Sequence, residues 1–323
     1  GVVQTMKQLG ADSTQGCGRA LWENNGELNK YGTTMGLMLL PFWTDGCISS
    51  MEGLFFEAAG STPYHFITAA AMSKQSSNPV RELRYDNNDA ALGVRYMQEL
   101  GVKYFMGFTS EAIAQASQQE GLTEVARSGP WVVYRVANSD VVTPLATQPV
   151  VVNISSNNPR ERWLEVGTSW FQHPEVWTTP IADNGPNEWQ RVDVAVDESQ
   201  REGEPNSNNR RVDVVKPATA LTPVPLDPVV VSNVKIGEES VNFSVDKIGV
   251  PVLVRVSYFP NWKVDGAKGP YRVAPNMMVV IPTSTNVSMH FGWNLRDYVA
   301  YLLSFAGIAW IVVDRRRSKL TAE

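Results

Sequence analysis

An uncharged stretch near the C-terminus constrains the fold of this chain more than any other feature of its sequence. Residues 298–313, which begin with Tyr298 and end with Val313, read YVAYLLSFAGIAWIVV without a charged side chain. This run of about 16 residues is slightly shorter than the roughly 20 that cross a hydrocarbon core, but flanking aromatic residues extend it into the interfaces. We expect a transmembrane helix over residues 295–314, with a buried core helix or an amphipathic surface helix as the alternatives.

A basic cluster follows this run directly. Its members are Arg315, Arg316, Arg317 and Lys319. Because basic clusters beside membrane spans stay in the cytoplasm, the sequence predicts a cytoplasmic tail over residues 315–323 and an extracytoplasmic location for the bulk of the chain. Residues 1–6, GVVQTM, show no signal peptide. We therefore expect a processed chain or, preferably, the C-terminal part of a longer polytopic protein of the cell membrane.

The composition indicates a folded chain of about two domains. It has 323 residues, of which 43% are hydrophobic and 19% charged, which excludes collagen-like, coiled-coil and wholly disordered classes. With 28 basic and 33 acidic residues the net charge is −5, so the basic surplus of a nucleic-acid-binding protein is missing. We expect no nucleic acid among the partners.

Two patterns divide the chain before the predicted span. From about residue 30 to 137, helix caps such as Thr62-Pro63 and either Asn88 or Asp89 alternate with strand-like runs, which predicts a small mixed α/β module over residues 1–148. From about Val150, short valine-rich runs alternate with turn residues, a pattern typical of an antiparallel β-sandwich over residues 149–294. One helix is expected to interrupt these strands, with Asn158 as its N-cap and Pro159 at its first position. The expected fold class is α+β, with a jelly-roll-like sandwich and one C-terminal transmembrane helix.

The chain has two cysteines, Cys17 and Cys47. In an oxidising compartment, two cysteines within one domain favour a disulfide. This one would close a loop of about 30 residues. Two separate reduced core thiols are the alternative.

The common catalytic and cofactor motifs are missing from the sequence. It contains no glycine-rich phosphate loop of either common type and no GxSxG nucleophile turn. Its three histidines, His65, His173 and His290, are far apart and lack metal-ligand spacing. We expect no cofactor and no metal.

One acidic stretch could carry chemistry. Asp45, Glu52 and Glu57 lie among aromatic residues after Trp43, and Glu23 lies in an earlier GRALWE segment. Carboxylates among aromatic rings are typical of sugar-processing sites, where the ring holds the sugar while an acid or base moves a proton. The three later carboxylates are weak catalytic candidates, and Trp43 and Glu23 are weak substrate-binding candidates. Helix caps, backbone hydrogen bonds and salt bridges are the alternative roles.

Tryptophans are frequent in the second half. Five of the ten tryptophans fall in the predicted β-rich part: Trp163, Trp170, Trp177, Trp189 and Trp262. Exposed indoles there would form a carbohydrate platform, and Trp262 is a third binding candidate. Mostly buried rings with satisfied N–H groups are the alternative.

Two long stretches, residues 31–66 and 254–292, resemble a known family. The first contains YGTTMGLMLLPFWTDGCISSMEG, and the second contains SYFPNWKVDG. They are similar to the C-terminal extracytoplasmic region of actinobacterial polytopic membrane proteins, labelled pyruvoyl-tetrahydropterin-synthase-related or YfhO-type and related to the GT-C glycosyltransferases. The likeness spans most of residues 17–313.

The resemblance implies a role in cell-envelope glycan assembly. The GT-C superfamily uses polyprenyl-phosphate sugars as donors and a catalytic acid in an outward loop near the first span, a part that this chain lacks. The chain would then contribute acceptor binding and be inactive alone. The alternative hypothesis is a non-enzymatic, membrane-anchored module that binds a glycan or a partner protein.

Overall fold

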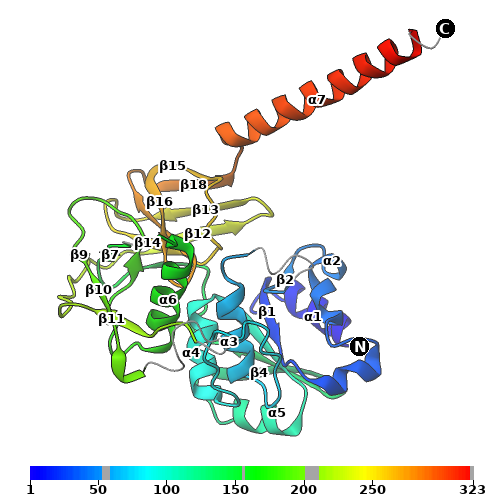
Figure 1. Cartoon of the computed structure of the whole chain (residues 1–323). Coiled ribbons are helices and arrows are strands. Elements are labelled where there is room, and N and C mark those ends of the chain that lie inside the picture. The colour runs from blue at the N-terminus through cyan, green and yellow to red at the C-terminus, as the bar shows by residue number, and fades with distance from the viewer. Residues whose placement is uncertain (53–58, 155–156, 201–210, 321–323) are drawn as a thin grey trace.

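The structure, a computed structural model of the chain, describes residues 1–52, 59–154, 157–200 and 211–320. It confirms the α+β class. Figure 1 shows a part in which helices cover a sheet, a β-rich part beside it, and a long C-terminal helix, α7, that points away from both.

A five-stranded mixed sheet organises the N-terminal part. Its order is β2-β1-β3-β5-β4. The strands are β1 (Gly18–Trp22), β2 (Ile48–Ser50), β3 (Val102–Gly107), β4 (Leu122–Ser128) and β5 (Trp131–Val136). β1 pairs in parallel with β2 and β3, whereas β5 pairs antiparallel with β3 and β4.

Helices cover both faces of this sheet. They are α1 (Val2–Ala11), the short α2 (Leu40–Trp43), α3 (Thr62–Ala71), α4 (Ala90–Glu99) and α5 (Ser110–Ala116), with 3-10 turns η1 (Gly26–Tyr31) and η2 (Gly36–Leu39). Successive strand residues point to opposite faces, so Ala20 and Trp22 pack in the cluster that contains α1 residues. Leu21 packs in the cluster formed with α3 and α4.

Two of the predicted helix caps are confirmed, whereas the cap predicted at Thr62 is one residue off, because α3 begins at Thr62 and Ser61 holds the N-cap position. The Asp89 carboxylate accepts a hydrogen bond from the backbone N–H of Leu92, and α4 begins at the next residue. The amide oxygen of Asn158 likewise accepts from the backbone N–H of Glu161 at the start of α6 (Pro159–Gln172), whose first residue is a proline.

A seven-stranded sheet begins the β-rich part. Its order is β6-β14-β17-β16-β8-β7-β9. The strands are β6 (Val142–Pro144), β7 (Val150–Val152), β8 (Ile181–Ala182), β9 (Arg191–Val192), β14 (Val252–Val254), β16 (Ala267–Val273) and β17 (Met277–Pro282). β7 pairs in parallel with β8 and β9, which departs from the antiparallel pairing expected throughout this part. α6 connects β7 to β8, and a connecting helix allows parallel neighbours.

A second sheet packs on the first to form the sandwich. Its order is β12-β13-β18-β15. The strands are β12 (Val231–Ile236), β13 (Ser240–Val245), β15 (Trp262–Asp265) and β18 (Asn286–Phe291). Phe243 and Met289 from this sheet share a buried cluster with Val254 and Met278 from the other. A small hairpin of β10 (Val194–Val196) and β11 (Val215–Pro217), with the turn η4 (Glu198–Gln200), lies outside both sheets.

The α/β part and the sandwich share a core. β6 follows the N-terminal sheet in the chain but pairs with β14, where Thr143 lies opposite Leu253. Tyr96 of α4 stacks on Phe171 of α6 at 4.4 Å between ring centroids. The two parts therefore meet along α4, α6 and β14.

The helix α7 (Leu295–Leu320) is exposed along its described side chains. Its segment Leu295–Arg315 is long and apolar enough to cross a membrane, and none of its most apolar window is buried within the chain. This exposure disagrees with a buried core helix.

Candidate functional site

The site residues predicted from the sequence do not come together in one site. Asp45 is exposed in the turn after α2, with a backbone φ of 51°, and Trp43 ends that helix half-buried. Trp262 is buried between the sheets of the sandwich. Glu57 lies outside the described residues. The two remaining carboxylates, of Glu23 and Glu52, are both buried.

Glu23 caps a helix. One carboxylate oxygen accepts hydrogen bonds from the backbone N–H groups of Phe108 (2.8 Å) and Thr109 (2.7 Å), and the other accepts from the Thr109 hydroxyl (2.7 Å). Thr109 is itself the N-cap of α5. Both carboxylate oxygens accept hydrogen bonds from this one segment, which is the geometry of a structural anchor.

Glu52 forms a buried pair with His65 of α3. Glu52 Oε1 lies 2.6 Å from His65 Nε2, and each side chain is 3% exposed. The other atoms of the pair, Glu52 Oε2 and His65 Nδ1, have no hydrogen-bond partner within the described part of the chain. A carboxylate that orients an imidazole is one element of an acid–base site. Sequence spacing alone did not reveal His65, because its partner is 13 residues away.

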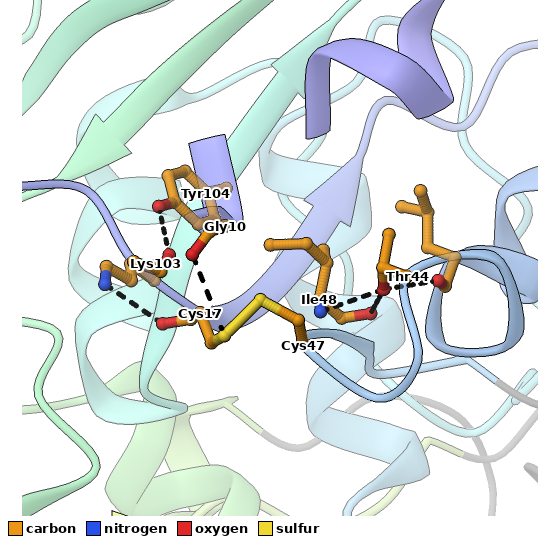
Figure 2. The surroundings of a disulfide bond; sticks show 9 residues. Gly10, Cys17, Thr44, Cys47, Ile48, Lys103 and Tyr104 are labelled. Carbon is orange, nitrogen blue, oxygen red and sulfur yellow. Dashed lines mark hydrogen bonds between the residues drawn. A yellow bond between two sulfur atoms is a disulfide. The ribbon is translucent and has the colours of Figure 1, made fainter. Parts of the chain in front are cut away.

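Cys17 and Cys47 form a disulfide with a Cα–Cα distance of 4.7 Å. Each cysteine precedes a strand, and the next residues, Gly18 and Ile48, are register partners in β1 and β2. Figure 2 shows the bond beside the Lys103 ammonium, which donates to the Cys17 carbonyl at 3.0 Å. A Cβ atom added at Gly10 would lie only 2.5 Å from Cys47 Sγ, so α1 packs directly on the bond.

A cavity of about 360 Å³ lies where α4, α6 and β14 meet. Arg95 and Glu99 line it from successive turns of α4, and Arg255 lines it just after β14. The indoles of Trp170 and Trp177 complete the aromatic part of the wall. The predicted platform of exposed indoles is wrong, because Trp163, Trp177, Trp189 and Trp262 are buried and Trp170 is half-buried, as in the alternative. The sequence analysis did not identify the charged residues of the cavity.

Two buried polar atoms of residues that line this cavity have no hydrogen-bond partner in the described structure. Arg255 Nη1 donates to the Asp140 carbonyl and to Thr143 Oγ1, both at 2.8 Å, whereas its buried Nε has no partner in the described structure. The buried hydroxyl of Thr179 is likewise unsatisfied. Buried polar groups normally have partners, so these two atoms depart from the usual pattern beside the cavity.

Burial perturbs the charged side chains of the cavity. It raises the pKa of Glu99 above its ordinary value of 4.5, and the charges of Arg255 and Arg95 oppose that rise. Burial also lowers the pKa of Arg255, while Glu99 and Asp140 raise it. Perturbed titratable groups in one cavity are characteristic of functional sites.

The raised pKa of Glu99 predicts a pH-dependent effect of Glu99→Gln. The folded chain holds this proton more tightly than the unfolded chain, so ionisation costs stability as the pH rises from 4.5 through the raised pKa. The variant has no charge to bury. The melting temperature of the variant minus that of the wild type is therefore expected to be larger at pH 8 than at pH 4, as measured by circular dichroism.

The matched control for this prediction is Glu120→Gln, because Glu120 is exposed. Its melting temperature should differ from that of the wild type by the same amount at both pH values. If the difference in melting temperature between Glu99→Gln and the wild type is also the same at both pH values, the effect assigned to the burial of Glu99 is contradicted.

Within the described residues, no three histidine, cysteine, aspartate or glutamate side chains come close enough together to hold an ion. The arrangement offers a binding cavity with a perturbed carboxylate and two guanidinium groups.

Comparison of the chain with protein-family models, with curated proteins and with solved structures gives no match.

Proposed function

We propose that this chain is the membrane-anchored, extracytoplasmic part of a GT-C-like protein of cell-envelope glycan assembly. In this proposal the cavity between α4, α6 and β14 binds the acceptor glycan. The observation that carries it is the cavity wall, in which Trp170 lies beside the charged residues Glu99 and Arg255. Aromatic rings beside polar groups with free hydrogen-bonding capacity suit the two faces of a sugar ring.

The location is supported by the C-terminal helix and by the cysteines. The exposed apolar segment Leu295–Arg315 is followed by basic residues, and such clusters stay on the cytoplasmic side of a membrane. The Cys17–Cys47 disulfide agrees with an oxidising environment for the rest of the chain.

The size of the cavity supports binding of a short saccharide segment. Its volume of about 360 Å³ is near the lower end of the range for small-molecule sites, roughly 300 to 1,000 Å³. A growing glycan would therefore place only its terminal units in the cavity. This agrees with the acceptor side of a transferase, in which the catalytic acid belongs to another part of the protein.

A non-enzymatic binding module is the second candidate function. It is favoured by the positions of the acidic residues, since Glu23 anchors the segment before α5 and Asp45 lies in an exposed turn, both outside the cavity lining. Both candidate functions share the same binding site. They differ in whether glycan transfer by the whole membrane protein depends on that site.

The test is isothermal titration calorimetry, in which oligosaccharides of galactose, arabinose, mannose and glucose are titrated into the full chain in lipid nanodiscs. We expect one class to bind, and Glu99→Gln to weaken binding about tenfold, as the loss of one charged hydrogen bond predicts. Glu120→Gln, on the exposed surface, should bind as the wild type does. If the wild type binds none of these sugars, the proposed site is refuted.

A further inference from the structure

An exposed aromatic surface lies at the end of the sandwich from which α7 leaves. We call its members, Phe259, Phe291 and Trp293, the aromatic rim. Their exposed fractions are 53%, 37% and 58%. The rings of Phe259 and Phe291 lie 5.7 Å apart, and Trp293 stacks on Tyr301 of α7 at 4.8 Å. The rim is therefore continuous with the apolar surface of the helix.

A hydrogen-bonded joint holds the rim against the start of α7. The buried Asn261 donates to the Asp297 carboxylate at 2.8 Å and accepts from the Asn294 amide at 2.9 Å. The Asp297 carboxylate also accepts from the backbone N–H of Asn294 at 2.8 Å, and the Asn294 side chain accepts from the backbone N–H of Arg296 at 3.0 Å. This reciprocal cap begins the helix, and Asn261 ties the cap to the sandwich.

The joint determines how deep the rim lies once α7 crosses a bilayer. The uncharged run begins at Tyr298, four residues after Asn294, and four helical residues span about 6 Å. The headgroup layer on each side of the hydrocarbon core is about 5 to 8 Å thick. Asn294 therefore lies within that layer. Phe259 is only two residues from Asn261, which is bonded to Asn294, so it lies at a similar depth.

We propose that the aromatic rim inserts into the headgroup layer of the extracytoplasmic leaflet of the cell membrane and holds the sandwich on the lipid surface. The occupant of this surface is lipid, because the rim adjoins the apolar helix and because aromatic side chains concentrate at membrane interfaces. The exposed Arg296 lies at the same level, where it can approach lipid phosphates. This proposal rests on membrane insertion of α7 and does not depend on the glycan site.

The rim explains the SYFPNW segment that the sequence analysis singled out. In this segment Phe259 supplies a lipid-facing ring and Asn261 supplies the joint to α7. Trp262 remains buried and supports Phe291 through an edge contact at 5.8 Å between centroids. The segment thus has a mechanical role at the membrane.

The test measures the depth of spin labels on the full chain in nanodiscs of phosphatidylcholine and phosphatidylglycerol. Because both native cysteines are in the disulfide, an introduced cysteine is the single free thiol. One label replaces Phe259 (Phe259→Cys), and the control replaces Ile248 (Ile248→Cys). Ile248 is 57% exposed and lies at the opposite end of β13.

Oxygen concentrates in lipid and a nickel chelate stays in water, so their relaxation effects report depth. We expect the ratio of oxygen to nickel accessibility to be about threefold higher or more at position 259 than at position 248, in accord with insertion into the headgroup layer. A water-like ratio at position 259 would overturn the proposal. So would a label at that position shielded from both reagents, which would indicate a protein partner on the rim.

A third label separates this proposal from the insertion of α7. Phe305 is 68% exposed in the middle of the apolar run, so a label at Phe305→Cys should lie deep in lipid. A lipid-like signal at position 305 with a water-like signal at position 259 refutes the aromatic rim alone. Water-like signals at both positions refute the membrane span and, with it, the rim.

Discussion

Replacement of Glu23 by alanine is expected to lower the free energy of unfolding by about 3 to 5 kcal/mol, because each buried donor that loses its acceptor costs about 1 to 3 kcal/mol. The Glu23 side chain is fully buried and accepts three hydrogen bonds, from two backbone N–H groups and one hydroxyl. Alanine leaves these donors without an acceptor. The N–H of Phe108 is buried, so water does not replace the lost bond.

The same site couples two elements that are distant in the chain. Glu23 follows β1, and its carboxylate holds the segment between β3 and α5. Loss of the contact therefore frees the N-terminus of α5 from the sheet. Urea unfolding followed by circular dichroism measures the effect. Glu23→Gln, which keeps the shape and one acceptor oxygen, should cost about half as much.

The control for this prediction is Glu27→Ala. The Glu27 side chain is 68% exposed and lies 3.9 Å from the Lys30 ammonium, a surface pair worth about 0 to 1 kcal/mol. Glu27 is only four residues from Glu23, so the comparison isolates burial and bonding from position in the chain. Equal costs for the two alanine variants would contradict the anchoring role of Glu23.

Features that depend on neighbouring residues were predictable from the sequence. The starts of α4 and α6 follow from Asp89 and from Asn158-Pro159, because a cap satisfies backbone groups only two or three residues away. The C-terminal helix was predictable for the same reason, since an uncharged run and a basic cluster adjoin in the chain.

Features that depend on distant pairing were not predictable. β6 pairs with β14 across more than a hundred residues, and nothing in the three residues Val142–Pro144 selects that partner. The parallel pairing of β7 with β9 is similar, because short valine-rich strands read alike in parallel and antiparallel sheets. Their arrangement is determined by the helix α6 and by the shared core.

The candidate site shows the same limit. Glu99 and Arg95 were unremarked because charged residues on a helix are usually solvated, and only the fold brings Arg255 to the same cavity. In contrast, clustering in sequence drew attention to Asp45 and Glu52, which the structure places in a turn and in a buried pair. Proximity along the chain was a poor guide to proximity in space.

Removal of the disulfide is expected to have an effect of similar size to that of Glu23→Ala. The Cys17–Cys47 bond closes a loop with a sequence separation of 30. In the chain-entropy description, such a loop stabilises the fold by about 3 to 4 kcal/mol. The double variant Cys17→Ser, Cys47→Ser should therefore lose about this amount in urea unfolding.

The bond lies where its loss affects a whole layer of the fold. It joins the starts of β1 and β2, and the loop between the cysteines supplies Trp22, Leu28 and Leu40 to the core cluster under α1. Without the bond, the unfolded loop gains entropy while the native packing of this cluster is unchanged. The stability should fall without loss of the fold, and the far-ultraviolet spectrum of the variant should match that of the wild type.

A reductant provides the matched control for this prediction. Dithiothreitol should shift the unfolding midpoint of the wild type toward that of the double serine variant, and it should leave the variant unchanged because the chain has no other cysteine. A wild-type midpoint that is equal in oxidised and reduced samples, with thiol counting to verify reduction, would contradict the stabilising role. Since such a bond persists only where thiols are oxidised, its presence in protein purified from membranes also bears on which side of the bilayer the α/β part faces.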